Sequence, residues 1–269
     1  MDLIGTEIYD AQKWVFSKRK GPIFTHILLA DEINRTPPKV QSALLEAMEE
    51  HQVTIGDETM KLDEPFFVIA TENPLEHEGT YPLPEAELDR FMMQLIMTYP
   101  SIEDERAILS SLTKIWEKKS TPKIAIGDFR EMREYIREHI TVSATLIEYV
   151  TDILTATRPR SSQSLQHFNT PTLQPSNTPI LQHSNPPSLQ PSNIPLLSYW
   201  ASTRAGLALI RAAQVLALLE DRDYVSPDDI KSLAPDILRH RIGLSYEWQR
   251  QNKSTDDIIS AILEEVRVP

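Results

Sequence analysis

The stretch Ile27-Leu28-Leu29-Ala30-Asp31-Glu32 decides the fold of the first part of this chain, because four apolar residues run directly into two acidic ones. A short, uninterrupted apolar run is typical of a parallel strand that is buried on both faces. If this run forms such a strand, both carboxylates lie at its carboxyl end, where open α/β sheets bind their ligands. The stretch therefore predicts a buried strand with an acidic pair at the ligand-binding edge.

Two further apolar runs predict that this strand belongs to a sheet within residues 1–100. Residues 66–70 form a run like the first one, and residues 92–97 form a weaker one because Gln94 interrupts it. The segment between the first two runs indicates a helix over residues 37–50, which Thr36 can cap. The pattern of strands and helix over residues 1–100 therefore predicts an α/β fold. 

A β-hairpin is expected over residues 53–62, because polar and apolar residues alternate around the pair Gly56-Asp57. After Pro100 the pattern becomes helical, with polar start signals followed by apolar side chains on one face. Helices are expected after Ser101, from Asp128, over 143–157, over 202–220, from Ser226 and after Thr255. An all-α part over residues 101–269 therefore follows the α/β part.

Residues 161–198 fit neither part. Leucine, asparagine and proline each recur there at a spacing of eight residues, and no charged residue occurs from 161 to 197. One leucine in each unit cannot build a core, so we expect a disordered insertion rich in Pro, Gln, Asn and Ser. The alternative is a dedicated binding segment, because Pro-rich stretches are preordered ligands.

The composition excludes several classes of protein. Lys and Arg number 27 against 39 Asp and Glu, and the net charge of −12 argues against nucleic acid as a main partner, because phosphate binding needs a basic face. The chain has no cysteine, which excludes disulfides and suits a cytoplasmic location. Its most apolar segment is interrupted by charged residues, so no association with a membrane is expected.

The acidic pair suits the hydrolysis of a nucleoside triphosphate. One carboxylate, Asp31, can hold Mg²⁺, and the next, Glu32, can polarise the attacking water as a general base. Taken alone the pattern is weak, because apolar strands often end in acidic residues.

Three other polar residues could complete such a site. Asn73 follows the second strand and could orient a water, although an asparagine before a proline often only makes a turn. Arg90 could stabilise charge on a transferring phosphoryl group, or form an ion pair with Glu87 or Asp89. Arg204 lies in the first turn of an apolar helix, where a cation is slightly unfavourable to the helix dipole, which makes a functional reason plausible but not required.

Together these residues resemble the MoxR family of AAA+ ATPases over nearly the whole chain apart from the repeat. The resemblance implies a partial AAA+ α/β core over residues 1–100 and a helical lid over 101–269, interrupted by the repeat at 161–198. The hairpin at residues 53–62 resembles an insert that marks this clade. The matching motifs are Leu28-Leu29-Ala30-Asp31-Glu32-Ile33-Asn34-Arg35, Pro37-Pro38-Lys39-Val40-Gln41-Ser42-Ala43-Leu44-Leu45-Glu46-Ala47-Met48, Glu78-Gly79-Thr80-Tyr81-Pro82-Leu83-Pro84-Glu85-Ala86 and Leu88-Asp89-Arg90-Phe91.

The resemblance also implies roles for the polar residues. Asp31 and Glu32 are similar to the Walker B pair of the family, and Asn73 to sensor 1. Arg90 is similar to the arginine finger that is offered to a neighbouring subunit, and Arg204 to sensor 2 on the lid. The implied cofactors are ATP and Mg²⁺. The implied assembly is a chaperone-like ring, expected to be a hexamer, with a von Willebrand A-domain protein as partner.

Two departures from the family pattern shape the functional expectation. The family has Gly-Ala-Ser-Pro-Arg-Ala at sensor 2, where this chain has Trp200-Ala201-Ser202-Thr203-Arg204-Ala205. The 269 residues contain no Gly-x-x-x-x-Gly-Lys-Ser/Thr sequence, the Walker A loop. We therefore expect an N-terminally truncated ATPase that alone neither binds nor hydrolyses ATP. The alternative is a non-catalytic interaction protein or the remnant of a truncated ATPase gene.

Overall fold

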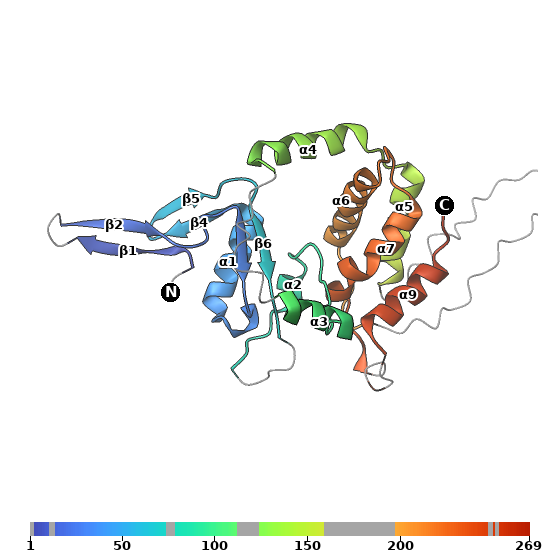
Figure 1. The fold of residues 1–269 in the computed structure, drawn as a ribbon, viewed down its shortest axis with the longest axis horizontal. Coiled ribbons are helices and arrows are strands. Elements are labelled where there is room, and N and C mark those ends of the chain that lie inside the picture. Colours follow the sequence, from blue (N-terminus) through green and yellow to red (C-terminus); the bar gives the residue numbers. More distant parts are fainter. Residues whose placement is uncertain are drawn as a thin grey trace, which may run out of the picture. The chain divides into compact units, whose positions relative to one another are not determined.

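A computed structural model describes residues 3–10, 14–73, 79–111, 124–158, 197–246, 250 and 253–269. Internal contacts divide the chain into two compact units, unit 1 over Met1–His139 and unit 2 over Ile140–Pro269. Figure 1 labels the elements of both, and each unit is described by itself. The boundary expected at residue 100 stays a prediction.

Unit 1 is built on two parallel strands, β3 (Ile27–Ala30) and β6 (Phe67–Ala70) (Figure 1). Their register pairs the first residue of one with the first of the other, and the last with the last. The predicted strands and the α/β character are therefore confirmed. Because the strands are parallel, their carboxyl ends meet at one edge, which brings residue 31 beside residue 71.

The two faces of this strand pair are not equally covered. Leu28 is 8% exposed and belongs to the core of unit 1, whereas Ile27 and Leu29 are 63% and 64% exposed. Phe67 and Ile69 on the neighbouring strand are also exposed. Successive side chains on a strand point to opposite faces, and the core lies against only one of them. The prediction of burial on both faces is therefore wrong for the described residues.

Residues 92–97 do not form the predicted third strand. Leu95, Ile96 and Met97 are 63%, 60% and 90% exposed. A strand needs a partner for its backbone N–H and C=O groups, and no described strand pairs with this segment. The apolar pattern is present, but none of the described strands lies beside it as a partner.

Helix α1 (Pro38–Glu50) supplies much of the core of unit 1. It begins one residue later than predicted, because Pro37 is its N-cap in an extended conformation. Thr36 instead ends the short 3-10 helix η1 (Ile33–Arg35). The buried apolar residues of α1 are Leu44, Leu45 and Ala47. They pack in one cluster with Ile23, Leu28 and Ile33.

Two β-hairpins complete the strands of unit 1. Strands β4 (Gln52–Ile55) and β5 (Glu58–Lys61) confirm the predicted hairpin, and Gly56 in its turn has a φ of 64°, which favours glycine. The other hairpin joins β1 (Gly5–Asp10) to β2 (Val15–Lys20), and no pattern above predicts it.

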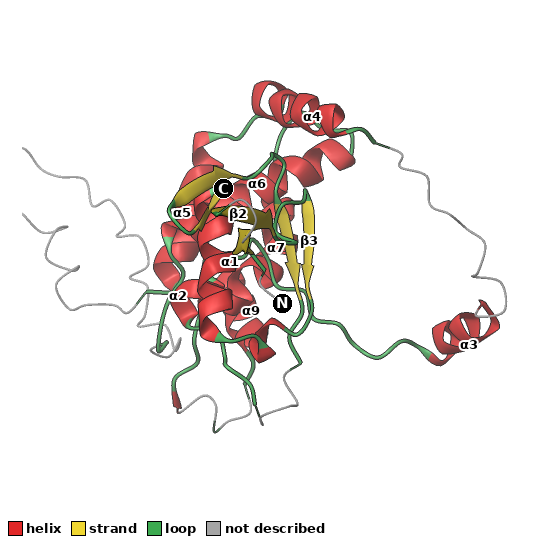
Figure 2. Ribbon diagram, turned by 90° about the vertical axis from the view of Figure 1, so that its left-hand side faces the viewer, coloured by secondary structure: helices red, strands yellow, loops and turns green. Residues whose placement is uncertain are grey.

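Three helices follow the strands in unit 1. Helix α2 (Glu85–Leu88) is short, and α4 (Ile126–His139) begins two residues before the expected start. Helix α3 (Ile102–Ser111) begins where predicted, since Ser101 Oγ accepts the Asp104 N–H at 3.1 Å. None of the described residues of α3 is buried, and Figure 2 shows this helix apart from β3.

Unit 2 is helical, as predicted for the lid. Each of the four α-helices described in this unit has a serine N-cap that accepts a backbone N–H, and the start predicted at Ser226 is confirmed. Two of these helices approach closely at Gly206, where a Cβ would lie 2.8 Å from Leu154 Cδ1. The elements are α5 (Ala144–Ala156), α6 (Thr203–Leu219), α7 (Pro227–Leu238), the 3-10 helix η4 (Arg239–Arg241) and α9 (Thr255–Glu265).

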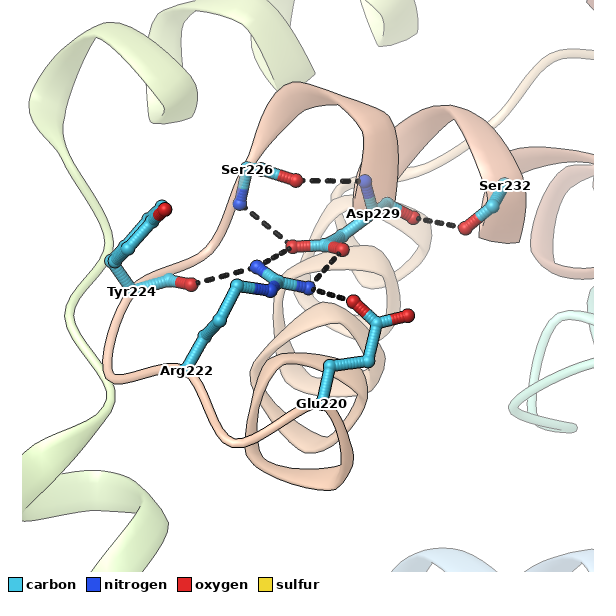
Figure 3. Close-up of polar contacts among 6 residues, drawn as sticks. All are labelled: Glu220, Arg222, Tyr224, Ser226, Asp229 and Ser232. Atoms are coloured by element: carbon cyan, nitrogen blue, oxygen red, sulfur yellow. Dashed lines mark hydrogen bonds and ion pairs between the residues drawn. The ribbon is translucent and has the colours of Figure 1, made fainter.

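Arg222 joins the end of α6 to the start of α7 (Figure 3). Its guanidinium donates to both carboxylate oxygens of Asp229, at 2.8 and 2.6 Å, and to Glu220 at 2.6 Å. The Asp229 carboxylate also accepts the Ser226 N–H at 2.7 Å. Burial alone would raise the pKa of Asp229, but the bonds from Arg222 and Ser226 outweigh it and lower that pKa.

Most of the repeat at residues 161–198 lies outside the described residues, so its disorder stays a prediction. The chain is described again from Leu197, which is 8% exposed. Among the described helices, none combines the length and the apolar character that a membrane crossing requires.

Candidate functional site

Thr71 ties together the ends of β3 and β6. Its N–H donates to the Ala30 carbonyl at 3.0 Å, and its own carbonyl accepts the Ile33 N–H at 2.9 Å. Its Oγ1 donates to Asp31 Oδ1 at 2.5 Å and accepts the Glu32 N–H at 2.8 Å. These bonds fix the turn that carries both carboxylates at the edge of the sheet.

The motifs that single out Asp31 and Glu32 do not single out Thr71. A signal for it exists in the sequence, because Thr71 comes directly after the second apolar run, as Asp31 comes after the first. In parallel strands that pair in register, these two positions are neighbours. A hydroxyl residue directly after one strand is therefore expected to form a hydrogen bond with a carboxylate directly after the neighbouring strand.

Glu32 has an unusual backbone conformation. Its φ of 49° and ψ of 54° lie in the left-handed region, which residues other than glycine adopt rarely. Its carboxylate forms an ion pair with Arg35 Nη1 at 3.1 Å, and its side chain stays 40% exposed. Strained residues of this kind cluster at functional sites, because surrounding contacts must hold them in place. Here the holding contact is the bond from the Glu32 N–H to Thr71.

Asn73 lies two residues beyond Thr71 and is half-buried. Its carbonyl accepts a bond from Asn34 Nδ2 at 3.4 Å, so the turn after Glu32 contacts the segment that carries Asn73. Asn34 is 9% exposed, and its Oδ1 has no hydrogen-bond partner among the described residues. The structure therefore brings Asp31, Glu32 and Asn73 to the same edge of the sheet.

Gln41 is a second residue of this region that the motif reasoning missed. It lies on α1 and is 3% exposed, which is unusual for a glutamine. Its Nε2 donates to the carbonyls of Ile33 and Tyr81, both at 3.0 Å. The Tyr81 N–H in turn donates to the Asn34 carbonyl at 2.6 Å. An amide in the first turn of a helix, on the same face as Leu44 and Leu45, is the sequence signal for such a link.

Arg90 follows α2 and points to α1. Its Nη2 forms an ion pair with Glu49 at 3.2 Å, and its side chain is 31% exposed. Neither of the partners weighed from the sequence, Glu87 and Asp89, forms a described ion pair with it. Within one chain, Arg90 is therefore held by a carboxylate at the end of α1.

Arg204 belongs to unit 2, whereas the acidic pair belongs to unit 1. It lies in the first turn of α6 and is exposed, and its N–H donates to Ser202 Oγ at 3.1 Å. Four of the five predicted residues therefore lie in unit 1, with Asp31, Glu32 and Asn73 at one edge of the sheet and Arg90 paired with Glu49 of α1. Arg204 stands in the other unit.

Mg²⁺ fits the acidic edge only together with a nucleotide. The described residues contain no group of three His, Cys, Asp or Glu side chains that could hold a metal by themselves. Asp31 Oδ1 binds Thr71, and Oδ2 of the same carboxylate has no hydrogen bond among the described residues. Mg²⁺ is often bound through one or two protein carboxylates, with phosphate oxygens and waters as its other ligands. One carboxylate with an open oxygen matches that pattern.

Two family models match the chain. The model for the ATPase family associated with various cellular activities (AAA) matches residues 1–93, and the model for the AAA lid domain matches residues 195–262. The first match includes Asp31, Glu32, Asn73 and Arg90. The second includes Arg204, so all five predicted residues lie inside the matched regions.

Related proteins match nearly the whole chain. The chain is 42% identical to the uncharacterized protein YeaC of Bacillus subtilis and spans 73% of it. It is 38% identical to the chaperone MoxR1 of Mycobacterium tuberculosis and spans 64% of that protein. A crystal structure of a candidate ATPase from Cytophaga hutchinsonii is 41% identical and superposes with a TM-score of 0.79, over the whole of this chain and 74% of the other. The chain belongs to the MoxR family of AAA+ ATPases, with an α/β core and a helical lid.

Proposed function

We propose that this chain supplies the hydrolysis half of an ATP site in a chaperone-like remodelling ATPase. One observation carries the proposal, the set of bonds by which Thr71 fixes Asp31 and Glu32 at the edge of the sheet. Asn73 lies at the same edge. The remodelling role is carried over from the chaperone MoxR1, to which the chain is similar.

The residues of the edge would have separate roles. Asp31 would hold Mg²⁺ through its open carboxylate oxygen, and Glu32 would accept the proton of the attacking water. Asn73 orients that water. When bound, the metal neutralises the negative charge that develops on the phosphates.

The two arginines extend the site beyond this edge. Arg90 serves the site of a neighbouring subunit, in a ring expected to be a hexamer, and Arg204 acts as sensor 2. Stabilising transition-state charge with an arginine from another subunit makes hydrolysis depend on assembly. A von Willebrand A-domain protein as partner and a cytoplasmic location complete the proposal.

The phosphate-binding half of the site is not among these residues. Most of the phosphate cradle comes from the backbone N–H groups and the lysine of a Walker A loop, and the 269 residues contain no such sequence. We therefore expect residues 1–269 alone neither to bind nor to hydrolyse ATP. A non-catalytic interaction protein is the alternative.

The test compares two polypeptides, residues 1–269 and the same residues behind a Walker A segment taken from a MoxR-family relative. We expect fluorescent ATP to bind only the second, with Mg²⁺-dependent hydrolysis that the Glu32→Gln variant abolishes while binding persists. Hydrolysis by residues 1–269 would disprove the expected inactivity. A chimera that binds ATP but does not hydrolyse it would favour the non-catalytic alternative. Equal hydrolysis with and without Glu32 would contradict the role of Glu32 as the base.

A further inference from the structure

Helix α1 holds both ends of the segment that leads to Arg90. Near the start of the helix, Gln41 Nε2 donates to the Tyr81 carbonyl at 3.0 Å. At its last turn, Glu49 forms the ion pair with Arg90 at 3.2 Å. The two residues are eight positions apart on α1, which at 1.5 Å per residue separates them by about 12 Å along the helix. The helix therefore has the geometry of a spacer beneath residues 81–90.

The same glutamine also contacts the turn that carries the acidic pair. Gln41 Nε2 donates to the Ile33 carbonyl at 3.0 Å, and Ile33 directly follows Glu32. The amide is 3% exposed, so its two bonds replace water that cannot reach them. A third bond, from the Tyr81 N–H to the Asn34 carbonyl at 2.6 Å, ties the two segments directly.

Apolar packing makes this connection stiff. Leu44, Leu45 and Ala47 of α1 are buried in the core of unit 1, and Leu88 and Phe91 on either side of Arg90 pack against that core. A displacement of the turn after Glu32 is then passed to α1 and to residues 81–90, because a close-packed core transmits strain.

We propose that Gln41 and Glu49 are positioning residues, and that α1 sets the place of Arg90 relative to the Asp31–Glu32 turn. The catalytic meaning of this link rests on the proposed function, in which the turn serves one ATP site and Arg90 serves the site of a neighbour. A shift of the turn at one site then moves the arginine that the same subunit presents to the next site. This link makes α1 the element that couples adjacent sites in a ring.

The link is testable without nucleotide on the 269-residue chain, because the chain has no cysteine and labels can be placed singly. Spin labels at Glu46→Cys on α1 and Glu85→Cys on α2, both exposed positions, report the distance between the helix and the arginine segment. We expect one narrow distance distribution, which the additional change Gln41→Met broadens. Without the Gln41 amide, the Tyr81 carbonyl loses its buried donor, and the segment is held less firmly. Hydrogen exchange of the Tyr81 N–H should then become about tenfold faster or more. Ser42→Ala, an exposed neighbour on α1, is the matched control and should change neither signal.

A second variant separates hydrogen bonding from simple filling of space. In Gln41→Glu, an ionised carboxylate would face two carbonyl oxygens with no proton to donate, so at a pH high enough to ionise this buried group the variant should behave like Gln41→Met. When the carboxyl is protonated at lower pH, it donates again, and both the narrow distribution and the Tyr81 protection should partly return. Gln41→Met should show no such pH dependence in its protection factor.

The outcomes are distinct. If Gln41→Met gives the same distances and exchange as Ser42→Ala, or if Gln41→Glu shows no recovery at low pH, the positioning role is wrong. Neither measurement involves ATP, so the failure of the ATPase proposal in the chimera would leave the link intact. Conversely, the chimera could prove active while Gln41→Met leaves the distance distribution of the 269-residue chain unchanged. That combination would refute the link and leave the proposed activity standing.

Discussion

At the scale of single residues, Glu32 combines a functional carboxylate with an unfavourable backbone conformation. Its left-handed φ of 49° suits glycine better than any residue with a Cβ. We therefore expect Glu32→Gly to be more stable than Glu32→Ala by about 1 kcal/mol, since both variants lose the same carboxylate and the Arg35 ion pair. Urea unfolding of the two variants measures this difference.

A matched position provides the control for this prediction. Glu46 is exposed on α1 and helical, and there alanine should be more stable than glycine by about 1 kcal/mol. The order of the two substitutions should thus reverse between positions 32 and 46. The same order at both positions would show that Glu32 is not held in the left-handed region in solution.

Asp229 shows how a buried carboxylate makes stability depend on pH. Its pKa is lowered in the folded chain by the bonds from Arg222 and Ser226, in spite of its burial. The stabilisation is therefore complete above the unfolded value of about 3.9 and is lost as pH falls through the lowered folded pKa. We expect Asp229→Asn to cost about 1–3 kcal/mol at pH 7 and progressively less below pH 4.

The measurement is the free energy of unfolding at a series of pH values for the wild-type chain and the variant. Asp223→Asn is a suitable control, because Asp223 is exposed in the same loop. Its effect should be small at every pH. A cost of Asp229→Asn that stays constant from pH 7 to pH 3 would contradict the role given to the Arg222 bonds.

At the scale of elements, β3 offers two adjacent leucines with opposite surroundings. Leu28 is 8% exposed and Leu29 is 64% exposed. Leu28→Thr should cost about 2–4 kcal/mol, because it removes buried apolar contacts and buries a hydroxyl. Leu29→Thr should stay within about 0.5 kcal/mol of wild type. Equal costs in urea unfolding would mean that both faces of β3 are covered in solution, contrary to the structure.

The sequence predicts elements well where the signal is local. Strands β3 and β6 are short apolar runs, and each described α-helix of unit 2 has a serine as its N-cap. Residues 92–97 have a strand-like pattern and fail to form a strand, because pairing depends on a partner that the pattern does not contain.

The residues of the candidate site also separate into those with a local sequence signal and those that depend on distant partners. Asp31 and Glu32 are visible because they follow an apolar run, whereas Thr71 and Gln41 act through bonds to residues about 40 positions away. A long-range bond is defined only when the strand register and the helix packing are known. The partner of Arg90 is a further example, since it lies on α1 and not among the nearby acids.

At the scale of the whole molecule, the five predicted residues are divided between the two units. Arg90 is paired with Glu49 of its own chain, and Arg204 belongs to unit 2. If Arg90 completes the site of a neighbour, then the acidic pair and the arginine of one subunit belong to two different sites. Assembly then becomes a condition for hydrolysis, and the ion pair with Glu49 is the state of Arg90 within the single chain.

Mixing two inactive variants tests this arrangement in the chimera that carries a Walker A segment. Glu32→Gln removes the base but keeps the arginine, and Arg90→Ala removes the arginine but keeps the base, so each variant alone should be inactive. In a mixed ring, a complete site forms where an Arg90→Ala subunit supplies the base and a neighbouring Glu32→Gln subunit supplies the arginine. With random assembly of equal amounts, about a quarter of the interfaces are complete, so about a quarter of the wild-type rate should return. Mixing Glu32→Gln with the double variant should restore nothing, because no subunit then carries the base. If the first mixture also stays inactive although both variants assemble, Arg90 acts within its own subunit and the proposed transfer between subunits is wrong.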